Sequence, residues 1–388
     1  MEDEIQNFIK VWIFVIASLI YCYFIVSKIP KGFLRLLALL PVFYIFTILP
    51  LNLYSFHLGA PTAFYLTWLG NSKLLLFSFN HGPLSSSSSS LSRSDPPKSL
   101  LFFISLACLP IKIKQNRSPK SSQNHTKPQK NKILQNPSSQ NIKIKQNPSL
   151  KSSQNLGKPR NINFFKNRFF VLALKALLLA LVIRIYDYRE HLNPNIILAL
   201  YCCHLYLGAE ITLAVSGALA RALLGQDLEP QFDEPYLSAS LQEFWGRRWN
   251  LMVTSILRST VYDPVRRIST PVLGKTWARL SGVFLTFVVS GLMHELLYYY
   301  MSRVDPTWEV TWFFVLHGIC MILEVLVKKI LTDRCQLQPW VSRPLTIGFV
   351  AVTGFWLFFP QLLRNGVDRK AISEYGLLVE FVRNKMRL

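Results

Sequence analysis

Charged side chains are scarce in this sequence. Asp, Glu, Lys and Arg make up 16% of its 388 residues, whereas hydrophobic residues make up 51%. The charges are also unevenly spread, because long apolar runs alternate with short charged connectors. A helix needs about 20 apolar residues to cross the hydrocarbon core of a bilayer, and several runs reach that length. The composition therefore favours an integral membrane protein over a soluble globular domain.

The sequence also lacks Cys-x-x-Cys pairs and a signal-peptide cleavage site. No Cys-x-x-Cys pair occurs, and five of the six cysteines lie within apolar runs. We therefore predict neither a zinc site nor a redox dithiol, and expect no metal and no bound cofactor. The first apolar run, which begins near Phe8, lacks the small-residue cleavage site of a signal peptide. We interpret it as a retained membrane anchor.

Acidic residues are absent from one long segment. Residues 111–160 contain ten Lys and two Arg but no Asp or Glu, so they supply +12 of the net charge of +22. In addition, 12 of the 14 residues in 111–124 recur in 142–155. Such polar sequence has little to bury, and basic loops are typical of the cytoplasmic side of a membrane. We interpret residues 85–165 as a low-complexity basic loop, largely disordered. Anionic lipid is its expected contact, and no folded nucleic-acid reader accompanies the charge.

The apolar runs predict an all-α fold, a polytopic transmembrane bundle of about seven to nine spans around a membrane-embedded cavity. We expect N-terminal transmembrane helices in residues 1–84 and a second helical region in residues 166–388. The acidic N-terminus and the basic first connector place the N-terminus in the lumen. The weakest expected span is 62–79, which ends in polar residues. The expected spans lie near residues 8–27, 33–53, 62–79, 169–187, 194–220, 280–301, 310–330 and 345–362.

Residues 240–250 combine aromatic and cationic side chains without being long enough to cross. In an α-helix Phe244 would pair with Arg248, and Trp245 with Trp249, at a spacing of four residues. Aromatic rings beside guanidinium groups are typical of a helix at the membrane interface. Taken alone, the segment is an amphipathic helix without chemistry. Asn250, which closes it, lies next to a further apolar run.

His294 lies inside an apolar run, at residues 283–300. An ionisable group at membrane depth is costly and therefore a functional candidate, and histidine can remain neutral there. Ser290 and Gly291 lie one turn earlier on the same helix face, where small residues allow another helix or a lipid chain to approach. The alternative is an interhelical hydrogen bond that only holds the bundle together.

Two more histidines, His204 and His317, also lie in apolar runs. Each is expected to make a structural polar contact or to line the cavity. Neither has the small-residue face that precedes His294 or an acid such as Glu295 beside it. His294 is therefore the preferred candidate.

The two motifs together resemble a known family. Ser290-Gly-Leu-Met-His-Glu resembles the buried-histidine motif of the membrane-bound O-acyltransferases, and Phe244-Trp-Gly-Arg-Arg-Trp-Asn resembles their aromatic-rich motif that ends in asparagine. Residues 229–253, Lys73-Leu-Leu-Leu-Phe and Leu109-Pro-Ile-Lys are similar to the plant wax synthase branch. The resemblance covers nearly the whole chain, except residues 85–99 and 115–165.

The resemblance implies a multi-pass enzyme of the endoplasmic reticulum membrane, with residues 166–388 as the catalytic core. It would transfer an acyl group from acyl-CoA, its co-substrate, to a lipid hydroxyl. A long-chain fatty alcohol would give a wax ester, and a sterol would give a steryl ester; the motifs do not separate the two. A membrane transporter with His294 along its path is a more remote alternative, which predicts inverted repeats that the sequence lacks.

This chemistry assigns a role to each candidate residue. A neutral imidazole at His294 would act as general base on the acceptor hydroxyl. Asn250 would orient the thioester or stabilise the developing oxyanion. The two arginines of the aromatic motif would bind the phosphates of CoA, and its tryptophans would pack against adenine or the pantetheine arm. The predicted substrate-binding set is Trp245, Arg247, Arg248, Trp249, Ser290 and Glu295.

Overall fold

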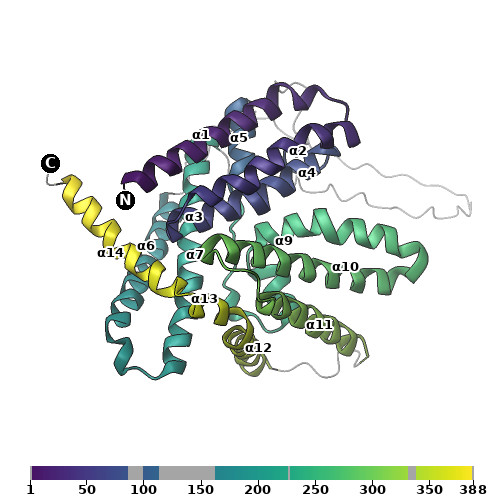
Figure 1. Ribbon diagram of the computed structural model, residues 1–388. Coiled ribbons are helices and arrows are strands. Elements are labelled where there is room, and N and C mark those ends of the chain that lie inside the picture. The colour runs from purple at the N-terminus through teal and green to yellow at the C-terminus, as the bar shows by residue number, and fades with distance from the viewer. Residues whose placement is uncertain (1, 86–98, 113–161, 226–227, 331–337, 387–388) are drawn as a thin grey trace, which may run out of the picture. The chain divides into compact units, whose positions relative to one another are not determined.

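The computed structural model describes residues 2–85, 99–112, 162–225, 228–330 and 338–386. Within these ranges the elements are helices, joined by short connectors (Figure 1). Most of the predicted basic loop, at residues 86–98 and 113–161, lies outside the described residues. The longer helices are α1 (Glu2–Phe24), α2 (Phe33–Ile48), α6 (Ile162–Ile185), α7 (Pro194–Leu224), α10 (Asp263–Ser302), α11 (Glu309–Ile330), α12 (Pro339–Thr353) and α14 (Val367–Met386).

The all-α membrane fold predicted from the sequence is confirmed. Seven helical stretches of the described chain are long and apolar enough to cross a membrane, and seven of the eight expected spans fall within or overlap them. The exception is 62–79. The seven stretches are Glu2–Lys28, Phe33–Asn52, Phe169–His191, Pro194–Leu224, Leu251–Ser302, Glu309–Ile330 and Pro339–Phe358.

Residues 62–79 nevertheless belong to a continuous helical run alongside α2. This run comprises α3 (Phe56–Ala63), the π-helical η3 (Phe64–Gly70) and α4 (Asn71–Ser78). The run begins shortly after the 3-10 turn that extends α2. It ends beside the start of α2, where the Gly32 N–H donates to the Ser78 carbonyl (2.8 Å). The run therefore lies antiparallel to α2. Its polar residues are tolerated because they face protein rather than lipid.

Lys73 shows how this polarity is accommodated. Its side chain is fully buried, and Nζ donates to the carbonyls of Leu106 (2.8 Å) and Leu109 (2.6 Å). These carbonyls are at the C-terminal end of α5 (Leu100–Cys108), where backbone acceptors lack helical partners. A cation at a helix C-terminus is electrostatically favourable. Two of the segments that carry the family resemblance, at Lys73 and Leu109, therefore meet in space.

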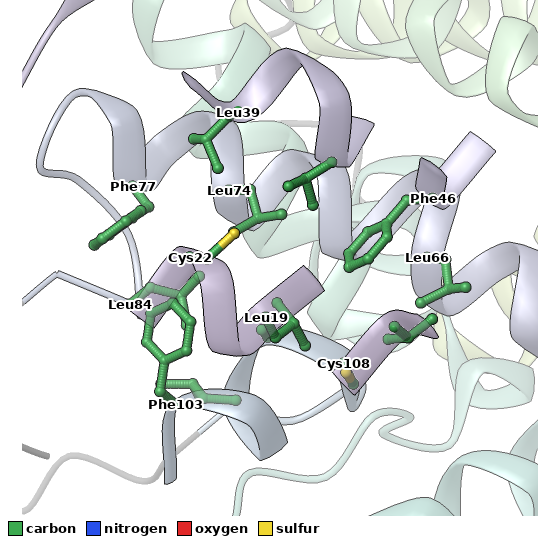
Figure 2. Close-up of a cluster of buried hydrophobic side chains, with 14 of the residues drawn as sticks. Leu19, Cys22, Leu39, Phe46, Leu66, Leu74, Phe77, Leu84, Phe103 and Cys108 are labelled. Atoms are coloured by element: carbon green, nitrogen blue, oxygen red, sulfur yellow. The ribbon is translucent and has the colours of Figure 1, made fainter. Parts of the chain in front are cut away.

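An apolar core joins α1, α2, α4 and α5 (Figure 2). Along α1, Val11, Val15, Leu19 and Cys22 are buried at intervals of three or four residues, which is the spacing of one helix face. The opposite face of α1 is apolar too but exposed, as a lipid-facing surface requires. Although α5 lies within the predicted loop 85–165, it packs into this core through Phe103 and its neighbours.

The helix that carries His294, α10, is two helices joined at Gly274. Gly274 has a φ of +74° and a ψ of 167°, a non-helical conformation that is favourable only for residues without a Cβ. Figure 1 shows that α10 folds back on itself. The second half carries Gly291 and His294 and packs along α11. A Cβ built on Gly291 would lie 2.9 Å from the Cα of Thr311, so the small-residue face does admit a neighbouring helix.

Replacing Gly291 with alanine is expected to destabilise the protein. The added methyl would meet backbone atoms of α11, which cannot rotate away, so the two helices must separate; overpacking of this kind costs about 1–3 kcal/mol. Thermal unfolding of the purified protein in detergent measures the effect. Gly348→Ala in α12 is the matched control, because no atom lies within 4 Å of its added Cβ. Equal melting temperatures for the two variants would contradict the prediction.

Candidate active site

Four π-helical segments occur in the described chain. They are η3 (Phe64–Gly70), η7 (Phe244–Arg248), η8 (Arg258–Tyr262) and η9 (Gly354–Phe358). Each contributes at least one side chain to a cavity. The wider π turn is frequent at functional sites, because its extra residue re-aims side chains that an α-helix would direct elsewhere.

The π turn η7 changes the expected pairing in the aromatic motif. The Trp249 N–H donates to the Phe244 carbonyl (2.8 Å), a hydrogen bond across five residues rather than four. Phe244 accordingly stacks on Trp249, with ring centroids 5.4 Å apart, instead of pairing with Arg248. Trp245 and Trp249 also remain in contact, edge to face, at 6.4 Å. The motif is therefore a compact aromatic cluster, not the regular α-helix that we expected.

Two cavities meet in this region. Cavity 1 has a volume of about 480 Å³ and lies among α3, η3, α7, α10, α13 (Pro360–Arg364) and α14. Cavity 2 has a volume of about 400 Å³ and lies among η3, η7, α9 (Leu251–Leu257), η8, α10 and α11. Five residues line both cavities, and both predicted catalytic residues are among them: Phe64, Trp249, Asn250, His294 and Leu297.

The His294 ring is held in one orientation. Its Nδ1 lies 2.7 Å from the Ser290 carbonyl, which can only accept, so Nδ1 carries the proton. The ring stacks on Phe314, with centroids 4.2 Å apart, and meets Trp68 edge to face at 5.0 Å. In the neutral ring Nε2 therefore has a free lone pair, and the residue lines both cavities. This arrangement suits a group that accepts a proton.

Asn250 is held in a backbone conformation that few residues adopt. Its φ is 40° and its ψ is 68°, in the left-handed region where asparagine is several-fold enriched. Its Oδ1 accepts from the Val253 N–H (3.2 Å) and so caps α9. The amide nitrogen has no hydrogen bond within the part of the chain that the structure describes. Asn250 therefore has a hydrogen-bond donor available at the junction of the cavities.

Trp245 is fixed by a chain of hydrogen bonds that ends on α12. Its indole Nε1 donates to Nδ1 of His317 (3.0 Å), and Nε2 of His317 lies 2.8 Å from the Thr353 hydroxyl. His317 is completely buried and lines neither cavity. The sequence left open whether His317 makes a structural polar contact or lines the cavity, and in the structure it makes a structural contact. One face of Trp245 still lines cavity 2.

The two arginines of the motif differ in their surroundings. Nε of Arg248 lies 2.7 Å from Glu243, and its NH1 donates to the carbonyl of Asp233 (3.0 Å). Partial burial of Glu243 opposes its ionisation, but hydrogen bonds from the Ala239 N–H and Arg248 outweigh this and lower its pKa. Arg247 is exposed. Neither arginine lines a cavity, so their predicted contact with CoA stays a prediction.

Ser290 and Glu295 face different surroundings. Ser290 lines cavity 2, beside the histidine that it orients through its carbonyl. Glu295 is buried and lines neither cavity. Its Oε1 accepts from the N–H and the hydroxyl of Thr311, both at 3.2 Å, near the start of α11. Carboxylates are favourable at helix N-termini, so this contact ties α11 to α10.

The cavities also contain polar residues that the sequence did not single out. Arg258 lines cavity 2, and its side chain is 69% exposed with only a loose ion pair to Asp263 at 3.9 Å. Its position directly after α9, ahead of other basic residues in the sequence, was the available signal. Cavity 1 contains Tyr201, Asp368 and Tyr375, which lie far from the motifs in sequence. Only the nearby His204 had been noted.

Comparison with known proteins places these residues in context. The Membrane bound O-acyl transferase family matches residues 228–316, a range that contains Asn250 and His294. The long-chain-alcohol O-fatty-acyltransferase of Simmondsia chinensis is 45% identical over 387 residues, which cover 100% of this chain and 98% of that relative. The probable long-chain-alcohol O-fatty-acyltransferase 1 of Arabidopsis thaliana is 44% identical, covering 99% and 98%. The acyl-CoA–sterol O-acyltransferase 1 of Arabidopsis thaliana is 39% identical, covering 98% of each.

Proposed function

Since this protein is an acyltransferase of the membrane-bound O-acyltransferase family, we propose that it esterifies a long-chain fatty alcohol with an acyl group from acyl-CoA, forming a wax ester. The observation that carries the proposal is the meeting of two cavities at His294 and Asn250. A reaction between two lipid substrates needs two binding spaces that open onto one catalytic group. The endoplasmic reticulum membrane is the proposed location of this multi-pass protein.

The linings of the cavities suggest which substrate each accepts. Cavity 2 carries hydroxyl, amide and guanidinium groups from Gln242, Thr254, Arg258, Tyr262 and Thr286. These groups suit the amides of pantetheine and the phosphates of CoA. Cavity 1 near the junction is formed by Phe64, Leu297 and their apolar neighbours, which suit a hydrocarbon chain. We therefore assign acyl-CoA to cavity 2 and the alcohol to cavity 1.

In the proposed reaction His294 handles the proton. Nε2 accepts the proton of the alcohol as its oxygen attacks the thioester carbonyl carbon. The carbonyl oxygen becomes negative in the tetrahedral intermediate and accepts a hydrogen bond from the amide nitrogen of Asn250. The carbon–sulfur bond then breaks, and the leaving thiolate takes the proton back from His294. The products are the ester and free CoA. Trp249 packs beside both substrates at the junction.

A sterol is the second candidate acceptor. The relative from Arabidopsis thaliana whose name specifies a sterol is similar over nearly the full length of this chain. The relatives named for long-chain alcohols are more similar, at 45% and 44% identity, and for this reason we favour a fatty alcohol.

Expression in a yeast strain without neutral-lipid acyltransferases tests the proposed function. Membranes from this strain would receive labelled acyl-CoA and a fatty alcohol, a sterol or diacylglycerol. We expect wax ester as the main product. Steryl ester as the main product would replace the proposed acceptor with the sterol. Absence of every ester, with the protein present in the membrane, would contradict the acyl-transfer proposal.

Arg258 and Arg247 are alternative candidates for the residue that binds the CoA phosphates. We expect Arg258→Ala to raise the KM for acyl-CoA by roughly three- to tenfold with little change in kcat, because a half-solvated charge contact is modest. Arg279→Ala, an exposed arginine that lines neither cavity, is the control. If Arg247→Ala raises the KM instead, the contact predicted from the aromatic motif is correct and the assignment to Arg258 is wrong.

A further inference from the structure

Cavity 1 is not apolar throughout. Eight polar residues line it without lining cavity 2, and five of these make hydrogen bonds or ring contacts with one another. We name them the polar end: His57, Tyr201, His204, Asp368 and Tyr375. They come from α3, α7 and α14. The centroid of the Tyr375 ring lies 4.3 Å from that of His57 and 5.8 Å from that of His204.

Most polar atoms of the polar end already have partners. His57 Nε2 donates to the Ala371 carbonyl (2.9 Å), and His204 Nε2 lies 3.2 Å from the Tyr375 hydroxyl. The Tyr201 hydroxyl donates to Oδ2 of Asp368 (2.6 Å). These contacts hold the side chains in place around the cavity. They also leave one carboxylate oxygen without a donor among the described residues.

That acceptor is Oδ1 of Asp368, which is buried and has no hydrogen-bond partner among the described residues. The first turn of α14 stabilises the charge of this carboxylate, but no N–H there donates to Oδ1. A buried carboxylate oxygen without a donor is costly, and a hydrocarbon chain in the cavity would not supply one. A hydroxyl group would.

We propose that the polar end binds a second hydroxyl of the acceptor, so that the preferred acceptors are α,ω-diols with an apolar chain between their ends. This inference rests on the proposed function. One hydroxyl reacts at His294, while the other donates to Oδ1 of Asp368 and accepts from Tyr375. The chain between them lies along Leu297, Met301 and their apolar neighbours. Met301 is seven residues beyond His294, so the cavity extends roughly 10 Å along α10.

The chemistry of the transfer is unchanged by the second hydroxyl. One hydroxyl of the diol loses its proton to His294 and forms the ester, and CoA leaves as the thiol. The other hydroxyl stays on the polar end and remains unreacted. The product is therefore a monoester with a free terminal hydroxyl. A site built around a hydroxyl discriminates against the analogue without one, because its polar groups would be left unpaired.

Direct competition between a diol and the mono-alcohol of equal chain length tests the inference. With the full-length protein in yeast membranes, we expect kcat/KM for the diol to exceed that for the mono-alcohol by about tenfold. Two equivalent hydroxyls alone account for about twofold of this. Across a series of chain lengths the preference should peak at one length, since the distance from His294 to the polar end is fixed.

Two variants remove the proposed contact in different ways. Asp368→Leu deletes Oδ1 together with the rest of the carboxylate. Tyr375→Phe deletes one hydroxyl while keeping the ring, so it is the variant to use if Asp368→Leu does not fold. Both should reduce the preference towards the twofold statistical value. Asp305→Leu, at an exposed aspartate outside the cavities, is the control and should keep the full preference.

The outcomes separate this inference from the proposed function. If the wild type esterifies mono-alcohols but shows only the statistical preference for diols, the inference is wrong and the proposed function stands. A preference that survives in both variants also overturns the inference. If the wild type esterifies neither acceptor, the proposed function fails and the inference fails with it.

Discussion

Replacing His294 with alanine is expected to reduce ester formation by at least about a hundredfold without loss of protein from the membrane. General base catalysis contributes typically a hundred- to ten-thousandfold, and His294 offers the one histidine lone pair that we place at the junction of the two cavities. The measurement is the initial rate of ester formation at saturating acyl-CoA, normalised to the amount of folded protein.

Two further histidine variants test whether the loss of activity is due to the basic nitrogen of His294. His81→Ala changes an exposed histidine that lines neither cavity and should leave the rate unchanged. His294→Gln keeps a side chain that can donate to the Ser290 carbonyl but has no basic nitrogen, so it should be as inactive as His294→Ala. A His294→Gln enzyme with near-normal turnover would mean that the residue only positions its helix, which is the structural alternative that the sequence left open.

Asn250 combines two functions that substitutions can separate. Its Oδ1 caps α9, and its amide nitrogen is free at the junction. Asn250→Asp keeps an oxygen for the cap but replaces the donor with a negatively charged acceptor. We expect its kcat to fall by about a hundred- to thousandfold, the usual effect of losing an oxyanion donor, with little change in stability.

The matched variants of Asn250 change the backbone and the cap. Asn250→Gly tolerates the positive φ but loses both the cap and the donor. Asn250→Ala adds backbone strain, so it should be the least stable of the three, by about 1–2 kcal/mol relative to the wild type. Rates per folded protein and melting temperatures report the two effects separately. An Asn250→Asp enzyme with wild-type kcat would remove Asn250 from the chemistry.

The two catalytic proposals depend on each other through the cavities. A base at His294 is useful only if the alcohol and the thioester reach it from different sides, and a donor at Asn250 is useful only beside the thioester carbonyl. Both residues line both cavities. The aromatic motif supports this arrangement, because the π turn η7 places Trp249 at the junction and leaves Trp245 anchored on His317.

The sequence determined the class of the protein and supplied the candidates for its catalytic residues. Apolar runs of the length of a bilayer predicted the helical membrane fold, because a chain in lipid must satisfy its backbone polar groups within helices. The cost of an ionisable group in such a run made His204, His294 and His317 candidates, and the small residues and the acid beside His294 made it the preferred one. These predictions depend on length, composition and local spacing, which the sequence contains. Only the run at residues 62–79 was ambiguous, since the burial of Lys73 depends on contacts with α5.

The tertiary structure decided which polar groups are free and which are already used. Arg248 and Glu295 are in the predicted substrate-binding set, and their contacts with substrate stay predictions. In the structure Arg248 contacts Glu243, and Glu295 accepts from Thr311 on the next helix, and neither contact could be read from the sequence. The sequence could not predict that Asp368 lines the same cavity as His294 either, because the two residues belong to different helices. His294 was identifiable from its own surroundings in the chain. The two cavities beside it, and Asp368 at the end of one of them, arise from packing between distant segments, which fixes the positions of the side chains.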